Sequence, residues 1–452
     1  MQRHGQHGHQ RHAHEPVHHP GQDHGHSHVA EDMLSVEEAY DRIIGSFGPL
    51  KAEERPVLEI LGQVLTADIT SPLDLPPLAN SAMDGYALQG QDIRGAGQDS
   101  PRELNVIGLI AAGQVPSQTV VPGTAIRIMT GAPIPDGADT VVPFEETDEV
   151  RRRNAGITLD RVAILSDLPN GSNLRPAGED LRRGQLVLEA GTVVRAAEVG
   201  VLASLGLEKA NVIRRPMVSI LATGDELATP GQPLDAGKIY DSNSFTVAAS
   251  VLACGGIPRL LGIARDNLED LRRKLNEAAP CDLVITSAGV SKGDYDIVKD
   301  VLTERGDINF WSVRMRPAKP LAFGHLRDAS GSTVPLMGLP GNPVSAMVAF
   351  EMFARPAIRT MLGRRPLNRP MVEGVLTDPI YNTDGRRVFA RVDVALSDGT
   401  YYATPTGPQG SNILTSMSRA NALAICPEDI PVKNAGERVR IIMLDWNEEV
   451  DL

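Results

Sequence analysis

Three polar loops rich in glycine carry most of the residue types in this chain that could do chemistry. They span residues 223–226, 287–296 and 338–345, and serine, asparagine and proline accompany the glycines. Glycine lets backbone amides approach an anion closely, hydroxyl groups add hydrogen-bond donors, and the N-terminus of a following helix attracts phosphate. Neither long loop has the spacing of a P-loop or of the GxGxxG fingerprint. The loops therefore predict a phosphate site outside the common nucleotide folds.

Carboxylates are interspersed in these loops. Asp225, Glu226, Asp294 and Asp296 would repel a bare phosphate, and a hard cation such as magnesium between them would remove the conflict. The simpler alternative is that Gly-Asp turns are common and that Asp294 only caps a helix that begins near Asp296. We expect magnesium and phosphate to share the site.

Two cationic residues and the scarcity of general bases limit the reaction types that this site could catalyse. Arg316 and Lys319 follow an expected strand, where they would attract an anion. His325 is the one histidine outside the N-terminal tail, and the three cysteines have no base nearby in the sequence. This pattern gives no support to a Cys-His or Ser-His-Asp nucleophile. Activated water is expected instead of a covalent intermediate.

The elements that must position the loops alternate between strand and helix from residue 216 to residue 363. Such alternation predicts a parallel sheet with helices on both faces, and ligands bind such sheets beyond the carboxyl ends of the strands. Ser242 or Asn243 is expected to cap a helix that ends at Leu252. The other expected elements are strands over 218–222, 257–264, 283–286 and 334–337, and helices over 268–277, 297–303 and 344–362.

The rest of the chain predicts an α/β and β multidomain protein around this doubly wound domain. Ser35 and Glu38 form a capping box before an amphipathic helix, and further helices are expected near 55–65 and at 197–205. Short apolar runs broken by glycine and proline indicate an inserted small β domain and a C-terminal β-barrel. The expected domains are a disordered tail (1–32), a discontinuous α/β first domain for dimerisation (33–70 with 151–213), the insertion (71–150), the central domain (214–364) and the barrel (365–452).

Composition limits the partners and the compartment. The net charge of -13 argues against nonspecific nucleic-acid binding, and the one dense basic run, at residues 151–153, is interpreted as a solvated turn between strands. The three cysteines lack the spacing of a zinc site or a disulfide framework, which favours a reducing compartment. No membrane helix or signal peptide is expected. We therefore expect a cytoplasmic protein.

The N-terminal tail holds all but one of the 11 histidines, interleaved with Gly, Gln and Pro. It cannot bury a core and is expected to be disordered. Its imidazoles could buffer zinc, nickel or copper, or the tail could be dispensable. The irregular spacing of the histidines leaves both hypotheses open.

At the loop residues the sequence resembles the MoeA family, whose relatives include the E domain of gephyrin. The resemblance runs from about Ser35 to near the C-terminus. Its motifs are residues 80–87 (Asn-Ser-Ala-Met-Asp-Gly-Tyr-Ala), 129–133 (Met-Thr-Gly-Ala-Pro), 223–227, 239–243 (Ile-Tyr-Asp-Ser-Asn) and the two long glycine-rich loops.

The resemblance implies four subdomains and an elongated homodimer whose active sites are completed by the inserted β domain of the partner chain. It also implies a molybdopterin molybdenumtransferase: adenylylated molybdopterin and molybdate would yield molybdenum cofactor and AMP, with Mg²⁺ assisting cleavage of the phosphoanhydride. A molybdopterin adenylyltransferase is a further expected contact.

The resemblance also assigns site residues. The catalytic residues would be Asp84 and Thr130 from the partner side with Glu226, Asp266 and Asp296, and the metal ligands would be Asp296 and Glu226. The substrate-binding residues would be Arg175, Asp180, Asp225, Asp241, Ser242, Asn243, Ser287, Gly289, Ser291, Gly293, Asp294, Arg316, Lys319, Pro340, Gly341, Asn342, Pro343 and Ser345.

Two departures from the family pattern bear on the site. Ala288 stands where a second glycine is usual, and Arg316 stands where lysine is frequent. Arginine keeps the charge but changes the donor geometry. Two other hypotheses are a dimeric scaffold that binds peptides, which would not need the polar loops, and an enzyme that adenylylates the pterin, which would consist of the α/β domain alone.

Overall fold

The computed structural model describes residues 33–278, 280–287, 301, 303–304, 306–327, 331 and 333–446. The histidine-rich tail and most of the helix expected at 297–303 lie outside these residues. So do five expected site residues: Gly289, Ser291, Gly293, Asp294 and Asp296. No helix in the described ranges is long and apolar enough to cross a membrane.

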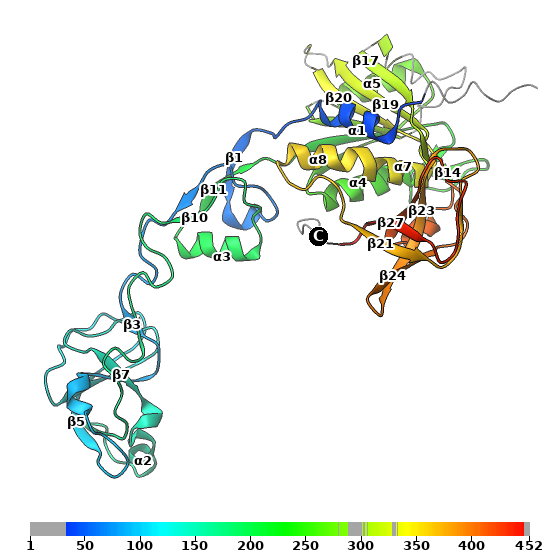
Figure 1. The fold of residues 1–452 in the computed structure, drawn as a ribbon. Coiled ribbons are helices and arrows are strands. Elements are labelled where there is room, and N and C mark those ends of the chain that lie inside the picture. The colour runs from blue at the N-terminus through cyan, green and yellow to red at the C-terminus, as the bar shows by residue number, and fades with distance from the viewer. Residues whose placement is uncertain are drawn as a thin grey trace, which may run out of the picture.

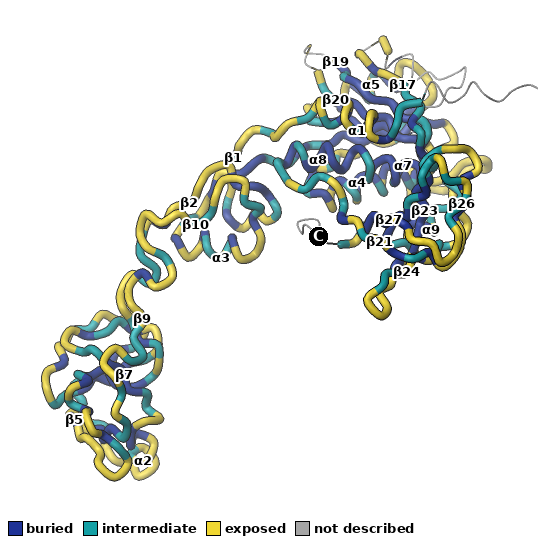
Figure 2. Tube along the Cα trace, viewed as in Figure 1, coloured by how far each residue is buried: buried dark blue, intermediate teal, exposed yellow. Residues whose placement is uncertain are grey.

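The molecule is elongated (Figure 1), with a small β domain at one end and the central and C-terminal domains at the other. The first domain lies between them. Buried residues gather separately along this length, and the neck that leads to the β domain is largely exposed (Figure 2). The β domain and the first domain therefore have their own cores, whereas the central core also includes Phe389 and Leu423 of the C-terminal domain.

The central domain is built on one sheet in the strand order β15-β12-β16-β20-β19-β17. The first four strands are parallel, whereas β19 and β17 run antiparallel to their neighbours. The expectation of a parallel sheet is therefore correct for the four strands that carry the loops and wrong for this edge, because the short connections on either side of β19 can only reverse the chain. The strands are β12 (Met217–Thr223), β15 (Ile257–Ala264), β16 (Leu283–Ser287), β17 (Gly306–Ser312), β19 (Pro320–Arg327) and β20 (Thr333–Leu339).

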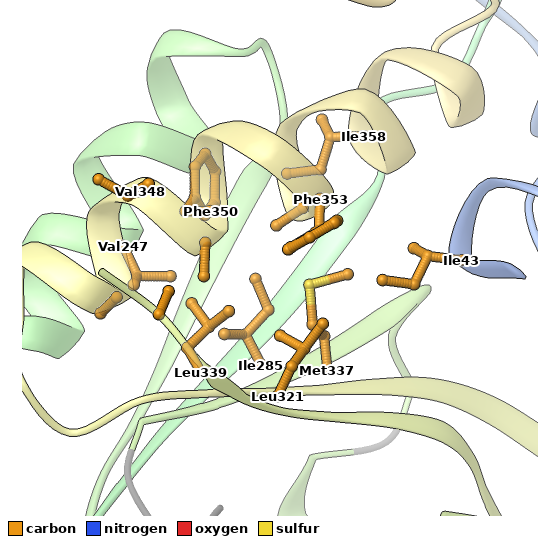
Figure 3. Close-up of a cluster of buried hydrophobic side chains, with 14 of the residues drawn as sticks. Ile43, Val247, Ile285, Leu321, Met337, Leu339, Val348, Phe350, Phe353 and Ile358 are labelled. Carbon is orange, nitrogen blue, oxygen red and sulfur yellow. The ribbon is translucent and has the colours of Figure 1, made fainter. Parts of the chain in front are cut away.

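Helices cover both faces of this sheet, as predicted. One face carries α4 (Asn243–Ala253), α7 (Pro343–Ala349) and α8 (Arg355–Met361), joined by the π-helical turn η4 (Phe350–Ala354), and the other carries α5 (Leu268–Glu277). The helix expected over 344–362 is thus a continuous helical run. Figure 3 shows Val247, Phe350 and Phe353 facing Ile285 and Leu339 of the sheet.

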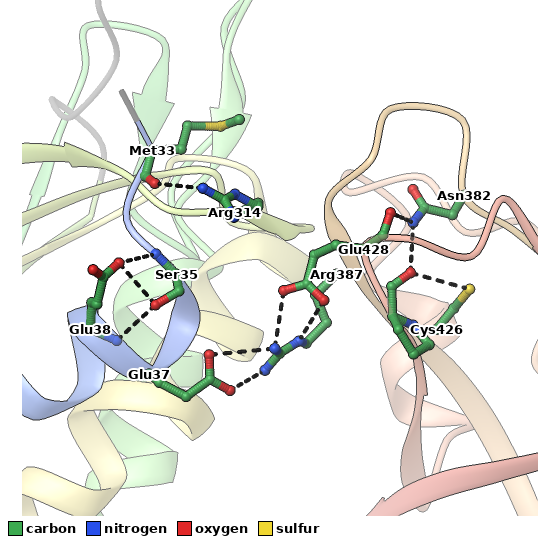
Figure 4. A network of polar contacts seen from close by, with 10 residues as sticks. Met33, Ser35, Glu37, Glu38, Arg314, Asn382, Arg387, Cys426 and Glu428 are labelled. Atoms are coloured by element: carbon green, nitrogen blue, oxygen red, sulfur yellow. Dashed lines mark hydrogen bonds and ion pairs between the residues drawn. The ribbon is translucent and has the colours of Figure 1, made fainter. Parts of the chain in front are cut away.

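Helix α1 (Val36–Ile44) begins with the predicted capping box: Ser35 Oγ accepts from the Glu38 amide at 3.1 Å, and Glu38 Oε2 accepts from the Ser35 amide at 2.8 Å. Its apolar face is buried in the central core against α8 and η4, although the expected bounds place this helix in the first domain. Glu37 pairs with Arg387, which also pairs with Glu428 at 3.0 Å (Figure 4), so α1 also contacts the C-terminal domain.

The first domain is discontinuous. Strand β1 (Ala52–Pro56) pairs with β11 (Lys209–Ile213), β2 (Ile69–Thr70) pairs with β10 (Leu186–Leu188), and α3 (Ala196–Ser204) matches the predicted helix. The helix expected near 55–65 was wrong. Its first residues pair with β11, η1 (Val57–Glu59) is one 3-10 turn, and Gly62 has φ +77°, which an α-helix cannot continue through.

The inserted β domain has a sheet in the order β7-β4-β6-β5-β8. Its elements are β3 (Asn80–Ser81), β4 (Gly85–Leu88), η2 (Gly90–Ile93), β5 (Arg102–Ile110), β6 (Thr124–Ile128), β7 (Thr140–Pro143), η3 (Phe144–Glu146), α2 (Glu149–Asn154), β8 (Arg161–Ile164) and β9 (Leu174–Arg175). Because β8 pairs with β5 and β9 with β3, the insertion extends past the expected boundary at residue 150. Residues 151–153 lie in α2, not in a turn.

The C-terminal domain is a closed β-barrel, as predicted: β23, β24, β21, β27 and β25 pair in turn, and β25 closes onto β23. These strands are β21 (Met371–Leu376), β23 (Arg387–Ser397), β24 (Thr400–Pro405), β25 (Ala422–Cys426) and β27 (Arg438–Met443). The smaller elements here and around the loops are β13 (Leu227–Ala228), β14 (Ile239–Tyr240), β18 (Met315–Arg316), β22 (Ile380–Tyr381), α9 (Thr415–Ser418) and β26 (Val432–Lys433).

Candidate functional site

A cavity of about 990 Å³ lies at the carboxyl ends of the parallel strands of the central sheet. Strands β12, β16 and β20 end there at Thr223, Ser287 and Leu339. Neighbouring parallel strands bring their following loops together, so the predicted polar loops meet at one edge. The predicted residues that line the cavity are Glu226, Asp241, Ser242, Asn243, Ser287, Arg316, Lys319, Pro340, Gly341, Asn342, Pro343 and Ser345.

Asn243 ties the loops to one another. Its Nδ2 donates to Ser287 Oγ at 2.8 Å and to the Gly341 carbonyl at 2.7 Å. Asp241 Oδ1 accepts from the Ser244 amide at 3.0 Å at the start of α4. Asp241 therefore provides the side-chain cap that we expected from Ser242 or Asn243.

The first loop turns sharply at Gly224, which has φ +140°. A Cβ atom at this position would lie 2.3 Å from Glu226 Oε2, so only glycine lets the Glu226 carboxylate fold back over the loop. The neighbouring Asp225 Oδ1 accepts from the Asp266 amide at 3.3 Å. Asp225 and Asp266 are thus adjacent, but neither lines the cavity.

Positively charged side chains also line the cavity. Arg316, Lys319 and Arg386 line it, and Arg316 Nη1 donates to Thr383 Oγ1 at 3.0 Å. Burial alone would raise the pKa of Asp384, but its pairing with Arg386 and the nearby Arg316 hold that pKa below its usual range. Two acidic residues, Glu226 and Asp241, therefore line the same cavity as the three cations Arg316, Lys319 and Arg386, which together are called the basic wall.

The C-terminal domain supplies part of the basic wall, which the sequence analysis missed. Arg386 and residues 409–412 line the cavity. The missed signal was the run Gly-Pro-Gln-Gly-Ser-Asn at 407–412, which has the same glycine-rich polar composition as the recognised loops.

Arg391 binds the backbone of the loop at residues 407–412. Its guanidinium donates to the carbonyl oxygens of Pro408, Gln409 and Gly410 at 3.3, 3.1 and 2.9 Å, and to Ser416 Oγ at 3.0 Å. Burial, and secondarily the charge of Arg316, lowers the pKa of Arg391 to about 10, which still leaves it protonated near neutral pH. A buried cation therefore lies directly behind the loop that faces the cavity.

Four predicted site residues lie elsewhere. Asp84 Oδ1 accepts from the Thr130 amide at 2.7 Å and from Thr130 Oγ1 at 2.8 Å, and these two bonds lower the pKa of Asp84. Arg175 pairs with Asn80 across β3 and β9, and the Asp180 amide donates to the Leu75 carbonyl at 3.0 Å. The β domain and its neck lie at the far end of the molecule from α7 and β14 (Figure 1), so one chain does not bring these residues to the cavity.

The acidic side chains are dispersed. Across the described ranges, no three or more His, Cys, Asp or Glu residues gather in a way that could hold a metal ion. Of the two expected metal ligands, Glu226 lines the cavity and Asp296 is outside the described residues.

Three family models match successive parts of the chain. The model for the MoeA N-terminal region (domain I and II) matches residues 34–206, the one for a "Probable molybdopterin binding domain" matches 219–360, and the one for the MoeA C-terminal region (domain IV) matches 373–444. Together they span all four parts of the fold.

Curated proteins and solved structures agree with these models. The chain is 39% identical over 393 residues to molybdopterin molybdenumtransferase 2 of Mycobacterium tuberculosis, covering 85% of this chain and 93% of that protein. It is 34% identical to the molybdopterin molybdenumtransferase of Haemophilus influenzae, covering 90% of this chain and 98% of that protein. The crystal structure of the molybdopterin biosynthesis MoeA protein from Pyrococcus horikoshii superposes with a TM-score of 0.74 at 29% identity, covering 92% of this chain and 100% of that one.

Proposed function

The chain belongs to the MoeA family and is a molybdopterin molybdenumtransferase of molybdenum cofactor biosynthesis, and we propose that it converts adenylylated molybdopterin and molybdate into molybdenum cofactor and AMP. The observation that supports the proposed reaction is the cavity at the carboxyl edge of the central sheet. Its basic wall and polar loops suit two anionic reactants, a phosphorylated pterin and an oxyanion.

The basic wall would bind and orient the anions. Arg316, Lys319 and Arg386 present guanidinium and ammonium donors to phosphate or molybdate oxygens. The Asn243 bridge fixes Ser287 and Gly341 relative to each other, so the loop donors need little reorganisation when a ligand enters. Water would be the attacking group, because the described part of the site has no Cys-His or Ser-His-Asp arrangement.

Magnesium would need substrate phosphates as well as protein carboxylates as ligands. Mg²⁺ in phosphoryl-transfer sites is commonly held by one or two carboxylates together with substrate phosphates, and Glu226 is a carboxylate on the cavity wall. Glu226 and Asp296 would hold it, and when bound it would neutralise charge on the phosphoanhydride. Asp225 and Asp266, next to this wall, would add negative charge that favours a divalent cation.

The assembly completes the proposal. Asp84 and Thr130 would act in the site of a partner chain within a homodimer, since they lie far from the cavity of their own chain. A molybdopterin adenylyltransferase would supply the adenylylated substrate, and the reaction would take place in the cytoplasm.

The test measures AMP release from adenylylated molybdopterin with molybdate and Mg²⁺. Asp296→Ala and Glu226→Gln should each lower the rate by at least about a hundredfold, because each removes a charge that the transition state would need. Glu269→Gln is the matched control, since Glu269 is exposed on α5 and does not line the cavity; it should keep the parental rate.

Deletion of the first 30 residues should leave the rate unchanged if the histidine-rich tail is dispensable. Absence of molybdate-dependent AMP release from well-folded, full-length protein would refute the proposed reaction.

A further inference from the structure

A buried ion pair lies in the β domain next to the Asp84 and Thr130 pair. Arg127 on β6 is 8% exposed and Glu149 at the start of α2 is 2% exposed. Arg127 Nε lies 2.8 Å from Glu149 Oε2, and Nη2 donates to Oε1 at 3.3 Å. The guanidinium also lies over two aromatic rings, with its carbon 5.4 Å from the Tyr86 ring centre and 5.5 Å from that of Phe144.

The third nitrogen of the guanidinium joins the two strands that carry the pair. Arg127 Nη1 donates to the Gly85 carbonyl at 3.1 Å and to the Ile128 carbonyl at 2.9 Å. Gly85 directly follows Asp84, and Ile128 lies two residues before Thr130. Asp84 immediately precedes β4, and Thr130 follows the end of β6. The strand residues Gly85 and Ile128 are paired with each other in register. One side chain thus fixes both backbone segments.

The energetics do not explain this arrangement as a simple source of stability. Burying an ion pair costs desolvation energy, and an apolar pair of similar volume often stabilises a core equally well or better. An apolar side chain could not donate to the Gly85 and Ile128 carbonyls. The contacts made by Arg127, and not its burial alone, distinguish it from an ordinary core residue.

We propose that Arg127, held by its counter-ion Glu149, is a positioning residue that sets the distance and orientation of the Asp84 and Thr130 side chains. The proposal rests on the proposed role of that pair in the partner's active site. Glu149 is itself fixed, because Arg153 Nη2 pairs with its Oε1 at 2.7 Å. The whole cluster is therefore a rigid support for two polar groups that must be presented to another chain.

The test compares AMP-release kinetics of Arg127→Lys, Glu149→Gln and the control Arg152→Lys. Lysine keeps the charge of Arg127 but cannot bridge both carbonyls and the carboxylate. We expect Arg127→Lys and Glu149→Gln to lower kcat by about ten- to a hundredfold, with KM changed less than about threefold, because displaced groups affect the reacting geometry most. Arg152 pairs with the buried Asp148 at 2.7 Å in the same domain but does not bond to the Gly85 or Ile128 carbonyl, so Arg152→Lys should keep kcat.

A second set of variants separates positioning from general stability. In a Thr130→Ala background, which has already lost one partner of Asp84, adding Arg127→Lys should cost less than about twofold, since groups that act as a unit are not additive. A full additive loss in that background would overturn the proposal, as would unchanged kcat in both single variants or loss of the folded β domain in both. If the parental protein itself releases no AMP, the proposed reaction fails. If the parent is active and both single variants keep the parental kcat, only the positioning role is refuted.

Discussion

At the scale of single residues, several polar and charged side chains in or beside the cavity are held in place by neighbours. Asp241 caps α4, Asn243 bridges two loops, and Asp384 pairs with Arg386. The functional side chains therefore have few alternative rotamers. Such preorganisation is what allows fixed donors to favour charge that develops during a reaction.

Arg391 gives a prediction at this scale. Arg391→Met should lower the stability of the C-terminal domain by about 1–3 kcal/mol, because three carbonyl oxygens lose a buried donor. It should also weaken binding of molybdate to the cavity, since the loop at 409–412 would lose its support. Urea unfolding and calorimetric titration with molybdate measure the two effects.

The matched control is Arg419→Met, because Arg419 is exposed in the same domain. Equal losses in both variants would mean that the charge removed, and not the loop contacts, accounts for the change.

At the scale of elements, periodicity predicted the central domain well and the small domains less well. The strand over 257–264 and the helix over 268–277 have the predicted bounds, because strong apolar periodicity is local information. Residues 52–56 form a strand only because β11, more than 150 residues later, pairs with them. The same limit explains α1, whose apolar face was recognised but whose packing partner was not.

The candidate site shows the same limit. Its loops could be recognised from glycines and polar residues that are close in the sequence. Arg386 and residues 409–412 could not be placed, since the packing of the barrel against the central domain brings them to the cavity. Composition predicts which loops can bind an anion, but it does not predict which domains will contribute loops to the same cavity.

Strand β4 gives a prediction at the scale of elements. A Cβ atom at Gly85 would lie 2.0 Å from the Val142 carbonyl oxygen of β7, so Gly85→Ala must separate the two strands. We expect a destabilisation of the β domain of about 1–3 kcal/mol. Hydrogen exchange of the β4 and β7 amides measures it.

Gly97→Ala is the comparison for Gly85→Ala. Gly97 lies in the same domain, and a Cβ atom there would meet only Ser100 Oγ at 3.5 Å, an ordinary contact. Faster exchange at β4 and β7 in this variant as well would contradict the steric explanation.

At the scale of the whole molecule, the distance between the β domain and the cavity predicts how defective chains complement each other. If each active site combines the central domain of one chain with the β domain of its partner, a mixed dimer of Asp84→Ala and Asp296→Ala chains contains one intact site. Random mixing of equal amounts should then restore about a quarter of the parental AMP-release rate, although each homodimer is inactive.

The measurement uses co-expressed chains with different affinity tags, so that the mixed dimers can be isolated; these should then have about half of the parental rate, because one of their two sites is intact. Two Asp84→Ala chains carrying the same two tags are the control. Persistent inactivity of folded mixed dimers would contradict shared sites.

The antiparallel pairing of β3 with β9 means that the inserted β domain leaves and rejoins the chain at neighbouring points. Its two ends could therefore be joined by a short turn without moving the rest of the molecule. The β domain could therefore be removed, or replaced by the β domain of a relative. Both termini and all strands of the central sheet would stay in place. The side chains that the β domain exposes to a partner can therefore change without changes in the central domain that holds the cavity.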